Sequence, residues 1–187
     1  MRTESRPGVC ALGLAFFLLQ SVNATLIPRL SFEQLTDSSE LVVFGHVTNS
    51  WAAWDSEHKY IWTHYTLSVD STLKGARSRT IEFAEPGGVV GDRAMSIAGS
   101  IIYGPGENVV VFLSRMPNGY LRTSGWAQGK FAVDSRGRVH GQAGIGAETM
   151  SVNGGSTGLR LATLEGMSVS DLGRMVSNRI QAQGRTK

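Results

Sequence analysis

Short runs of β-branched and aromatic residues, separated by turn-forming residues, fill the chain between positions 41 and 133. Runs of this length are typical of β-strands, and the glycine and proline clusters between them are typical of chain reversals. We expect strands at 41–47, 60–69, 79–84, 109–113, 120–123 and 130–133. Several short strands at close spacing favour a mainly β fold, a small closed or partly open antiparallel barrel of the OB-fold-like kind.

Two glycine clusters lie in the stretch 86–107 and raise the alternative of a phosphate-binding loop. Such a loop presents backbone amides at the start of a helix, and neither cluster precedes a helical pattern. The first cluster also lacks the lysine and hydroxyl residue of a nucleotide loop, and the second runs directly into the apolar run at 109–113. The glycines therefore predict strand reversals, and no cofactor is expected.

Two helices are expected outside the strands. Ser31 followed by Gln34 forms a capping box and predicts a short N-terminal helix. Ser168 or Ser170 is expected to cap a C-terminal helix over 168–183, whose apolar stripe would dock on the barrel. That stripe consists of Leu172, Met175, Val176 and Ile180. The segment 144–167 is rich in glycine, serine and threonine and is expected to be a linker.

The N-terminus has the pattern of a secretory signal peptide. Two arginines precede an apolar run of about eleven residues at 9–19, and small residues at Val22 and Ala24 suit cleavage after Ala24. The run is shorter than the roughly 18 to 20 residues of a membrane-spanning helix. We therefore expect a signal peptide at 1–24, a barrel domain at 25–143, and a secreted or periplasmic product with no membrane span.

Composition narrows the classes of function. Cys10 is the only cysteine and falls in the signal peptide, which excludes a cysteine nucleophile and thiolate metal ligands in the exported part. The formal net charge of the chain is +3, and no basic run or stripe is present. A nucleic-acid partner is therefore not expected.

A catalytic centre is not evident in the sequence. No G-x-S-x-G motif occurs, and no spacing pairs two of the carboxylates that could work as acid and base. Those carboxylates are Glu82, Glu85, Asp92 and Glu107. A small hydrolase remains an alternative, and Glu107 beside His46 or His140 in a cleft would favour it.

Aromatic residues are the best candidates for a ligand-binding surface. Trp51 and Trp54 are expected in a loop at 48–59, Tyr60 and Trp62 on the less apolar face of the next strand, and Trp126 in another connection. An exposed tryptophan offers a large apolar area with a polar group, as binding surfaces require. The sequence thus predicts a non-catalytic binding module for an extracytoplasmic protein, with a carbohydrate as the alternative ligand. The opposite interpretation is that Trp54 and Trp62 close the end of the barrel.

Two histidines suggest a metal site. If the strands 41–47 and 60–69 form a hairpin centred near Asp55, His46 lies across from His64, with His58 in the loop between them. A slip of one residue would send one histidine to the other face, and two histidines alone form a weak site.

The order of motifs resembles an uncharacterised family of secreted bacterial proteins. The resemblance covers residues 41–133 and rests on "ELVVFGHV", "IWTHYTLSVDSTLKG", "IEFAEPGG", "GPGENVVVFL" and "GKF". The same order is distantly similar to netrin-like domains and tissue inhibitors of metalloproteinases, which implies an OB-fold barrel with flanking helices. Those inhibitors begin with a zinc-chelating cysteine, whereas cleavage here would leave Thr25 first, so the resemblance does not imply inhibitor chemistry.

Overall fold

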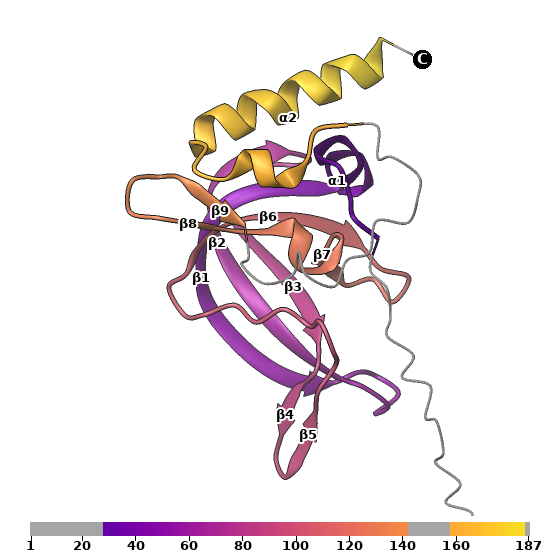
Figure 1. Cartoon of the computed structure of the whole chain (residues 1–187). Coiled ribbons are helices and arrows are strands. Elements are labelled where there is room, and N and C mark those ends of the chain that lie inside the picture. Colours follow the sequence, from indigo (N-terminus) through magenta and orange to yellow (C-terminus); the bar gives the residue numbers. More distant parts are fainter. Residues whose placement is uncertain (1–27, 142–157, 186–187) are drawn as a thin grey trace, which may run out of the picture.

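A computed structural model describes residues 28–141 and 158–185, which form a curved antiparallel sheet with helices packed on it (Figure 1). The main sheet has seven strands in the order β3-β2-β1-β6-β8-β9, and β7 pairs with β6. Its strands are β1 (Leu41–Trp54), β2 (Ile61–Lys74), β3 (Thr80–Pro86), β6 (Asn108–Arg115), β7 (Leu121–Thr123), β8 (Lys130–Val133) and β9 (Val139–Gly141). β4 (Gly88–Val90) and β5 (Arg93–Met95) form a separate two-stranded sheet, in which Gly88 packs against the β1–β2 hairpin. The helices are α1 (Phe32–Ser38), α2 (Val169–Gly184) and the 3₁₀ turns η1 (Trp126–Gly129) and η2 (Leu161–Leu164).

The expected fold class is confirmed as a mainly β antiparallel sheet with short N-terminal and C-terminal helices. The ladder does not close into a barrel. In the described part of the chain β3 is the last strand on one side, and β7 has backbone pairing only with β6. Side chains nevertheless bridge β3 and β7, because the carboxylate of Glu85 accepts the backbone N–H of Thr123 at 2.9 Å.

Strand β6 lies at the centre of the molecule and is buried on both faces, as its unbroken apolar run predicts. Val109, Val111 and Leu113 pack into the core on the concave side with Tyr65 and Phe83. Residues Val110 and Phe112 point the opposite way, into a second core beneath the helices. Alternate side chains of β6 therefore contribute to two hydrophobic cores, one on each face of the sheet.

The second core is covered by α1, η2 and α2. It contains Leu35 from α1, Leu164 from η2, and Leu172 and Val176 from α2, all of which are fully buried. The expected docking of the C-terminal stripe holds for Leu172 and Val176, whereas Ile180 near the end of α2 is exposed. The capping box at α1 is present, since Ser31 and Gln34 each accept a backbone N–H from the other.

The segment 144–167, expected to be a linker, is part of the folded structure in its second half. Residues 144–157 lie outside the described part of the chain, as does the predicted signal peptide. From Gly158 onward the chain belongs to the fold: the carbonyl of Leu159 accepts the N–H of Phe32 at 2.9 Å, and that of Met167 accepts the N–H of Val139 at 2.8 Å. The low apolar content of the segment did not indicate that Leu164 is a core residue.

The first hairpin is longer than the sequence predicts. The expected loop at 48–59 is wrong over most of its length, because β1 continues to Trp54 and pairs with β2 as far as Ile61. Only the short turn between these strands remains, where the carboxylate of Asp55 accepts the N–H groups of Lys59 and Tyr60. Alanine, serine and asparagine weaken the β-propensity of 48–54, and pairing with β2 overrides it.

Glycine is required where β1 and β2 approach most closely. A Cβ atom on Gly45 would lie 2.0 Å from the carbonyl oxygen of Ser68. The register of β1 against β2 shifts at this point, between Phe44 and Gly45, as expected of a β-bulge. The cluster at 104–106 forms a turn, as predicted, with Gly106 at a positive φ of 73°. In the first cluster, Gly87 at φ 106° separates β3 from β4, which begins at Gly88.

Candidate functional site

An aromatic face, defined as Trp51, Trp62, His64 and Tyr120, is the clearest candidate for a functional surface. Trp51 lies across from His64 in the β1–β2 ladder, and Ala53 lies across from Trp62. Residues in register or two apart share a face of the sheet, so these side chains point the same way. The Trp51 and His64 rings are stacked with centroids 5.1 Å apart and planes 9° apart.

Tyr120, the residue before β7, contacts this face from the other side. Its ring meets the rings of Trp62 and His64 edge-on, at centroid distances of 5.4 Å and 5.2 Å. The buried His64 is held further by Glu82, whose carboxylate lies 3.3 Å from Nδ1. Trp51 is the outermost member, and 39% of its surface is exposed. The arrangement holds a half-exposed indole in one orientation on a strand.

A cation lies close to this face. Arg122 is two residues beyond Tyr120 on β7, and its guanidinium carbon sits 3.7 Å from the ring centroid of Trp126. The same guanidinium pairs with Glu85 at 3.2 Å. Trp126 adopts a left-handed backbone conformation with φ 57°, which is uncommon for a bulky residue. The stack fixes the orientation of both side chains.

The structure separates the five aromatic residues that the sequence grouped together. Trp51 and Trp62 share the aromatic face, and Trp126 stacks on the neighbouring Arg122. Trp54 lies across from the buried Ile61, so it points to the opposite side of β1 from Trp51, where it stacks on His58 in the turn. Tyr60 is in that turn and is 45% exposed. The sequence did not predict that His64 and Tyr120 lie beside Trp51 and Trp62, or that Arg122 stacks on Trp126. These contacts depend on how the strands pair, which the sequence pattern does not reveal.

Two ion pairs are buried in the concave core and its rim. Glu85 is 1% exposed, and burial raises the pKa of its carboxyl group, although hydrogen bonds from Thr123 and the charge of Arg122 oppose the shift. Lys130 is 5% exposed and binds the carboxylate of Glu107 at 2.8 Å. Its ammonium group also lies 4.4 Å from the ring centroid of Tyr103. The two ion pairs join the segments before and after β6, although Nη2 of Arg122 is buried without a hydrogen-bond partner among the residues that the structure describes.

The geometry expected for a hydrolase is not formed. Glu107 binds Lys130 and the backbone N–H of Gly104. The nearest carboxylate to His46 is instead Asp70, with a nitrogen–oxygen distance of 3.7 Å. His140 lies between Asp134 and Glu165, at 3.1 Å and 2.6 Å. Neither His46 nor His140 is therefore paired with Glu107, the arrangement that would favour a hydrolase.

The predicted register of the two candidate metal ligands is wrong. His46 lies across from Ser68, and His64 lies across from Trp51. The hairpin is centred closer to His58 than to Asp55, and shifts in register along β1 add to the difference. Within residues 28–141 and 158–185 no three His, Cys, Asp or Glu side chains are grouped as metal ligands.

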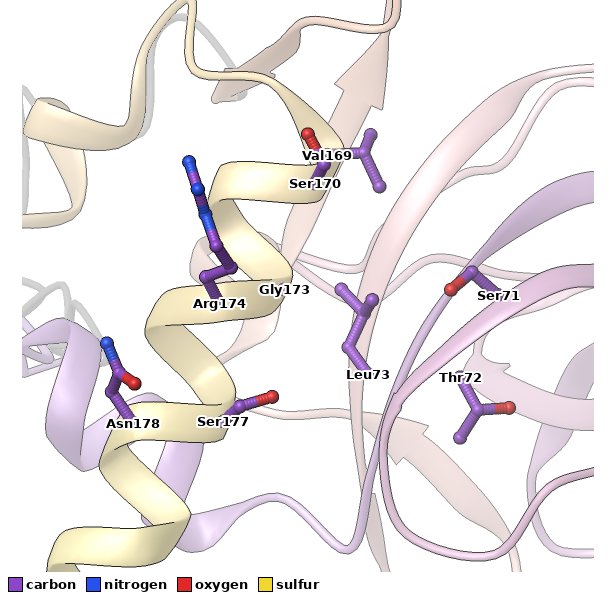
Figure 2. Close-up of a pocket in the computed structure, with 9 residues that line it drawn as sticks. All are labelled: Ser71, Thr72, Leu73, Val169, Ser170, Gly173, Arg174, Ser177 and Asn178. Carbon is purple, nitrogen blue, oxygen red and sulfur yellow. The ribbon is translucent and has the colours of Figure 1, made fainter.

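A hollow with a volume of about 640 Å³ lies elsewhere, between β2 and α2 (Figure 2). Leu73 points from the strand toward the helix, where Gly173 allows close approach because a Cβ there would lie 3.1 Å from the Leu73 side chain. The remaining lining residues are Ser71, Thr72, Val169, Ser170, Arg174, Ser177 and Asn178. Hydroxyl groups and one guanidinium line this open groove, a set that contains no acid and base pair.

Comparison of the chain with protein-family models, curated proteins and solved structures found no match. None of the described helices is long and apolar enough to cross a membrane. The functional interpretation therefore depends on the geometry of the aromatic face itself.

Proposed function

We propose that this chain is an exported, non-catalytic binding module that recognises an extracytoplasmic protein through its aromatic face. The observation that carries the proposal is the half-exposed Trp51, which stacks on His64 and is supported by Tyr120 through that histidine. Aromatic anchors that are already held in place lose little conformational entropy when a partner binds, and they dominate many protein interfaces. Export is inferred from the signal-peptide pattern at 1–24.

The shape of this surface favours a protein over a small molecule. Small ligands bind in concave sites with converging polar groups, whereas protein interfaces are built around aromatic anchors with a polar rim. Two hollows lie away from this face, one between α2 and the second half of β2, and one along the second half of β2 and residues 77–79. The exposed Glu82, which contacts His64, flanks the aromatic face and supplies part of such a rim.

A carbohydrate is the second candidate, and one observation favours it. The Trp51 ring is covered on one side by the nearly parallel ring of His64, with 9° between the planes. One side of the indole therefore remains for a flat ligand such as a sugar ring. A polar rim would serve a sugar as well as a protein.

The fold underlying this proposal is a partly open, OB-fold-like barrel of the kind suggested by the resemblance to netrin-like domains. The side-chain bridge between β3 and β7 supports this description, because Glu85 of β3 binds Arg122 and the backbone of Thr123 in β7. OB-type barrels commonly bind ligands through one sheet face and adjoining loops. The aromatic face occupies such a position, on β1 and β2 next to β7.

Replacing Trp51 tests the proposal. Parent protein, Trp51→Ala and the matched control Trp54→Ala, which alters the opposite side of the same strand, are immobilised and exposed to extracytoplasmic proteins of the source cell. We expect the parent and Trp54→Ala to retain a partner whose affinity for Trp51→Ala is weaker by roughly thirty-fold or more, the size of a hot-spot loss. Thermal unfolding should show that Trp51→Ala costs about 1 kcal/mol, the value of one aromatic pair.

Equal retention by all three proteins would remove the aromatic face as the binding site. The carbohydrate alternative is measured by titrating neutral oligosaccharides and following tryptophan fluorescence. A saturable change that is lost in Trp51→Ala, without any retained protein, would favour that second function.

A further inference from the structure

The second half of β1 has a free edge. Strand β6 pairs with β1 only from Leu41 to His46, and the last backbone bonds on that side connect Val47 to Gly106 and Glu107. Beyond this point β1 continues to Trp54 with β2 on its other side (Figure 1). In the described part of the chain, no element other than β2 forms a backbone hydrogen bond with residues 48–54.

The register identifies which backbone groups face this edge. The N–H of Asp55 donates to the carbonyl of Tyr60, and that of Gly87 donates to the carbonyl of Ile61, which therefore points toward β3. Backbone groups alternate between the two sides of a strand. Because Trp54 lies across from Ile61, its polar backbone groups point away from β2, and the same holds two and four residues earlier, at Ala52 and Ser50.

This edge lacks the charged and proline residues that commonly prevent pairing, while Gly88 of β4 packs against the Ala52 side chain on one face of the hairpin. Residues 48–54 include no charged side chain and no proline, and the bulge at Val47 precedes the free segment. Exposed edges in natural sheets are commonly blocked by lysine, proline or a covering segment. Residues 48–51 are exposed and residues 52–54 are partly exposed, so another chain can approach this edge.

We propose that a second copy of this chain pairs with the free edge, antiparallel and about a two-fold axis at Ala52. In this register Ser50 faces Trp54 of the other copy, and Ala52 faces itself, so the outward backbone groups of both strands meet. Trp51 then faces Ala53 of the other copy. Each large indole is matched with a small residue, whereas a register centred on Trp51 would oppose two indoles.

Charge also favours a second copy as the occupant. A two-fold axis brings identical segments together, and any charge close to that axis would face its own copy. The segment 48–54 is neutral and meets this requirement. Pairing of so short an edge buries an area at the small end of specific interfaces, so a concentration-dependent equilibrium between monomer and dimer is expected. The proposal rests on backbone groups and is independent of the partner proposed above.

Sedimentation velocity of the parent, Ser50→Pro and Ser50→Ala, from about 1 μM to about 1 mM, tests the proposal over the range expected for a small interface. Proline removes an N–H that points away from β2, whereas alanine keeps it. We expect the parent and Ser50→Ala to dimerise and the dissociation constant of Ser50→Pro to rise at least about ten-fold. Circular dichroism should show that Ser50→Pro keeps the parent's fold.

A second measurement needs no variant. In a mixture of isotope-labelled and unlabelled parent protein, the register places the Hα of Trp51 next to the Hα of Ala53 from the other copy, which predicts an intermolecular nuclear Overhauser effect. A parent that stays monomeric at the highest concentration overturns the proposal. So does a folded Ser50→Pro whose dimer dissociation constant equals that of the parent, or a parent dimer without this contact.

Discussion

His140 binds two carboxylates from different segments of the chain, and neither contact is predictable from its position in the sequence. Its two ring nitrogens face Asp134 in the β8–β9 turn and Glu165 after η2. Glu165 also accepts the backbone N–H of Gly141 at 2.9 Å. The imidazole thus connects the edge strand β9 to the segment that precedes α2, and both contacts favour its protonated form.

The titration of His140 should reflect these contacts. Hydrogen bonds to Glu165 and Asp134 raise its pKa above the ordinary 6.5, and those from Arg138 and His140 lower the pKa of Asp134 to about 2. The histidine contribution to stability is therefore complete below pH 6.5 and is lost as the pH rises through the raised folded-state pKa. The Asp134 contribution is present above its ordinary pKa of 3.8 and is lost as the pH falls through about 2.

Proton NMR of the imidazole measures this pKa directly. We expect the pKa of His140 to decrease toward 6.5 in Glu165→Gln, measured against the parent protein under the same conditions. An unchanged His140 titration in Glu165→Gln would show that the carboxylate does not control the imidazole.

At the scale of elements, the long β1–β2 hairpin carries the aromatic face and the free edge, and its shape depends on the bulges in β1. The register shifts at Val42, Phe44 and Val47, and Gly45 lies in the middle of this segment. Bulges increase the local twist and bend of a strand. The arched course of β1 and β2 in Figure 1 agrees with that effect.

Gly45→Ala should be strongly destabilising. The added methyl group would lie 2.0 Å from the carbonyl oxygen of Ser68, so the strands must separate. Overpacking of this kind costs about 1 to 3 kcal/mol or more. Gly104→Ala is the control, since its nearest contact is an ordinary 3.9 Å. Urea unfolding of both variants should show a large loss only for Gly45→Ala, and equal stabilities would contradict the close approach.

Sequence patterns predicted the elements whose burial is regular. The run at 109–113 indicated a strand buried on both faces, and Ser31 with Gln34 identified the start of α1, because these signals depend on neighbouring residues alone. The neighbours of Trp51 were not predictable. They depend on the bulges in β1 and on the return of β7 toward β3, which pairing across the sheet decides. Leu164 was missed because one apolar residue in a glycine-rich segment has no periodicity.

At the scale of the whole molecule, the two cores share strands β1 and β6 and should unfold together. Residues on opposite faces of β6 belong to the concave core and to the helix-covered core. A substitution that destabilises the core beneath α2 should therefore also destabilise the core on the concave side. A domain of this size with a shared central strand is expected to behave as one cooperative unit.

Leu172→Ala tests this coupling. Removing a fully buried leucine from α2 should cost about 2 to 5 kcal/mol. Tryptophan fluorescence, which reports the β1–β2 hairpin and η1, and far-ultraviolet circular dichroism, which includes α2, should change at the same reduced temperature. Ser177→Ala, on the exposed side of α2, should leave both transitions in place. Separate transitions in Leu172→Ala would mean that the helix layer melts independently of the sheet.

The hydrogen bond between Phe32 and Leu159 has a consequence for biosynthesis. A ribosome synthesises α1 long before the residues that cover it. Leu35 therefore becomes fully buried only after Leu164 and Leu172 have been synthesised. A nascent chain that ends within β9 would carry an uncovered apolar layer on the side that α2 later occupies. Such a layer is a natural binding site for a chaperone during synthesis, and its release would coincide with the arrival of the last helix.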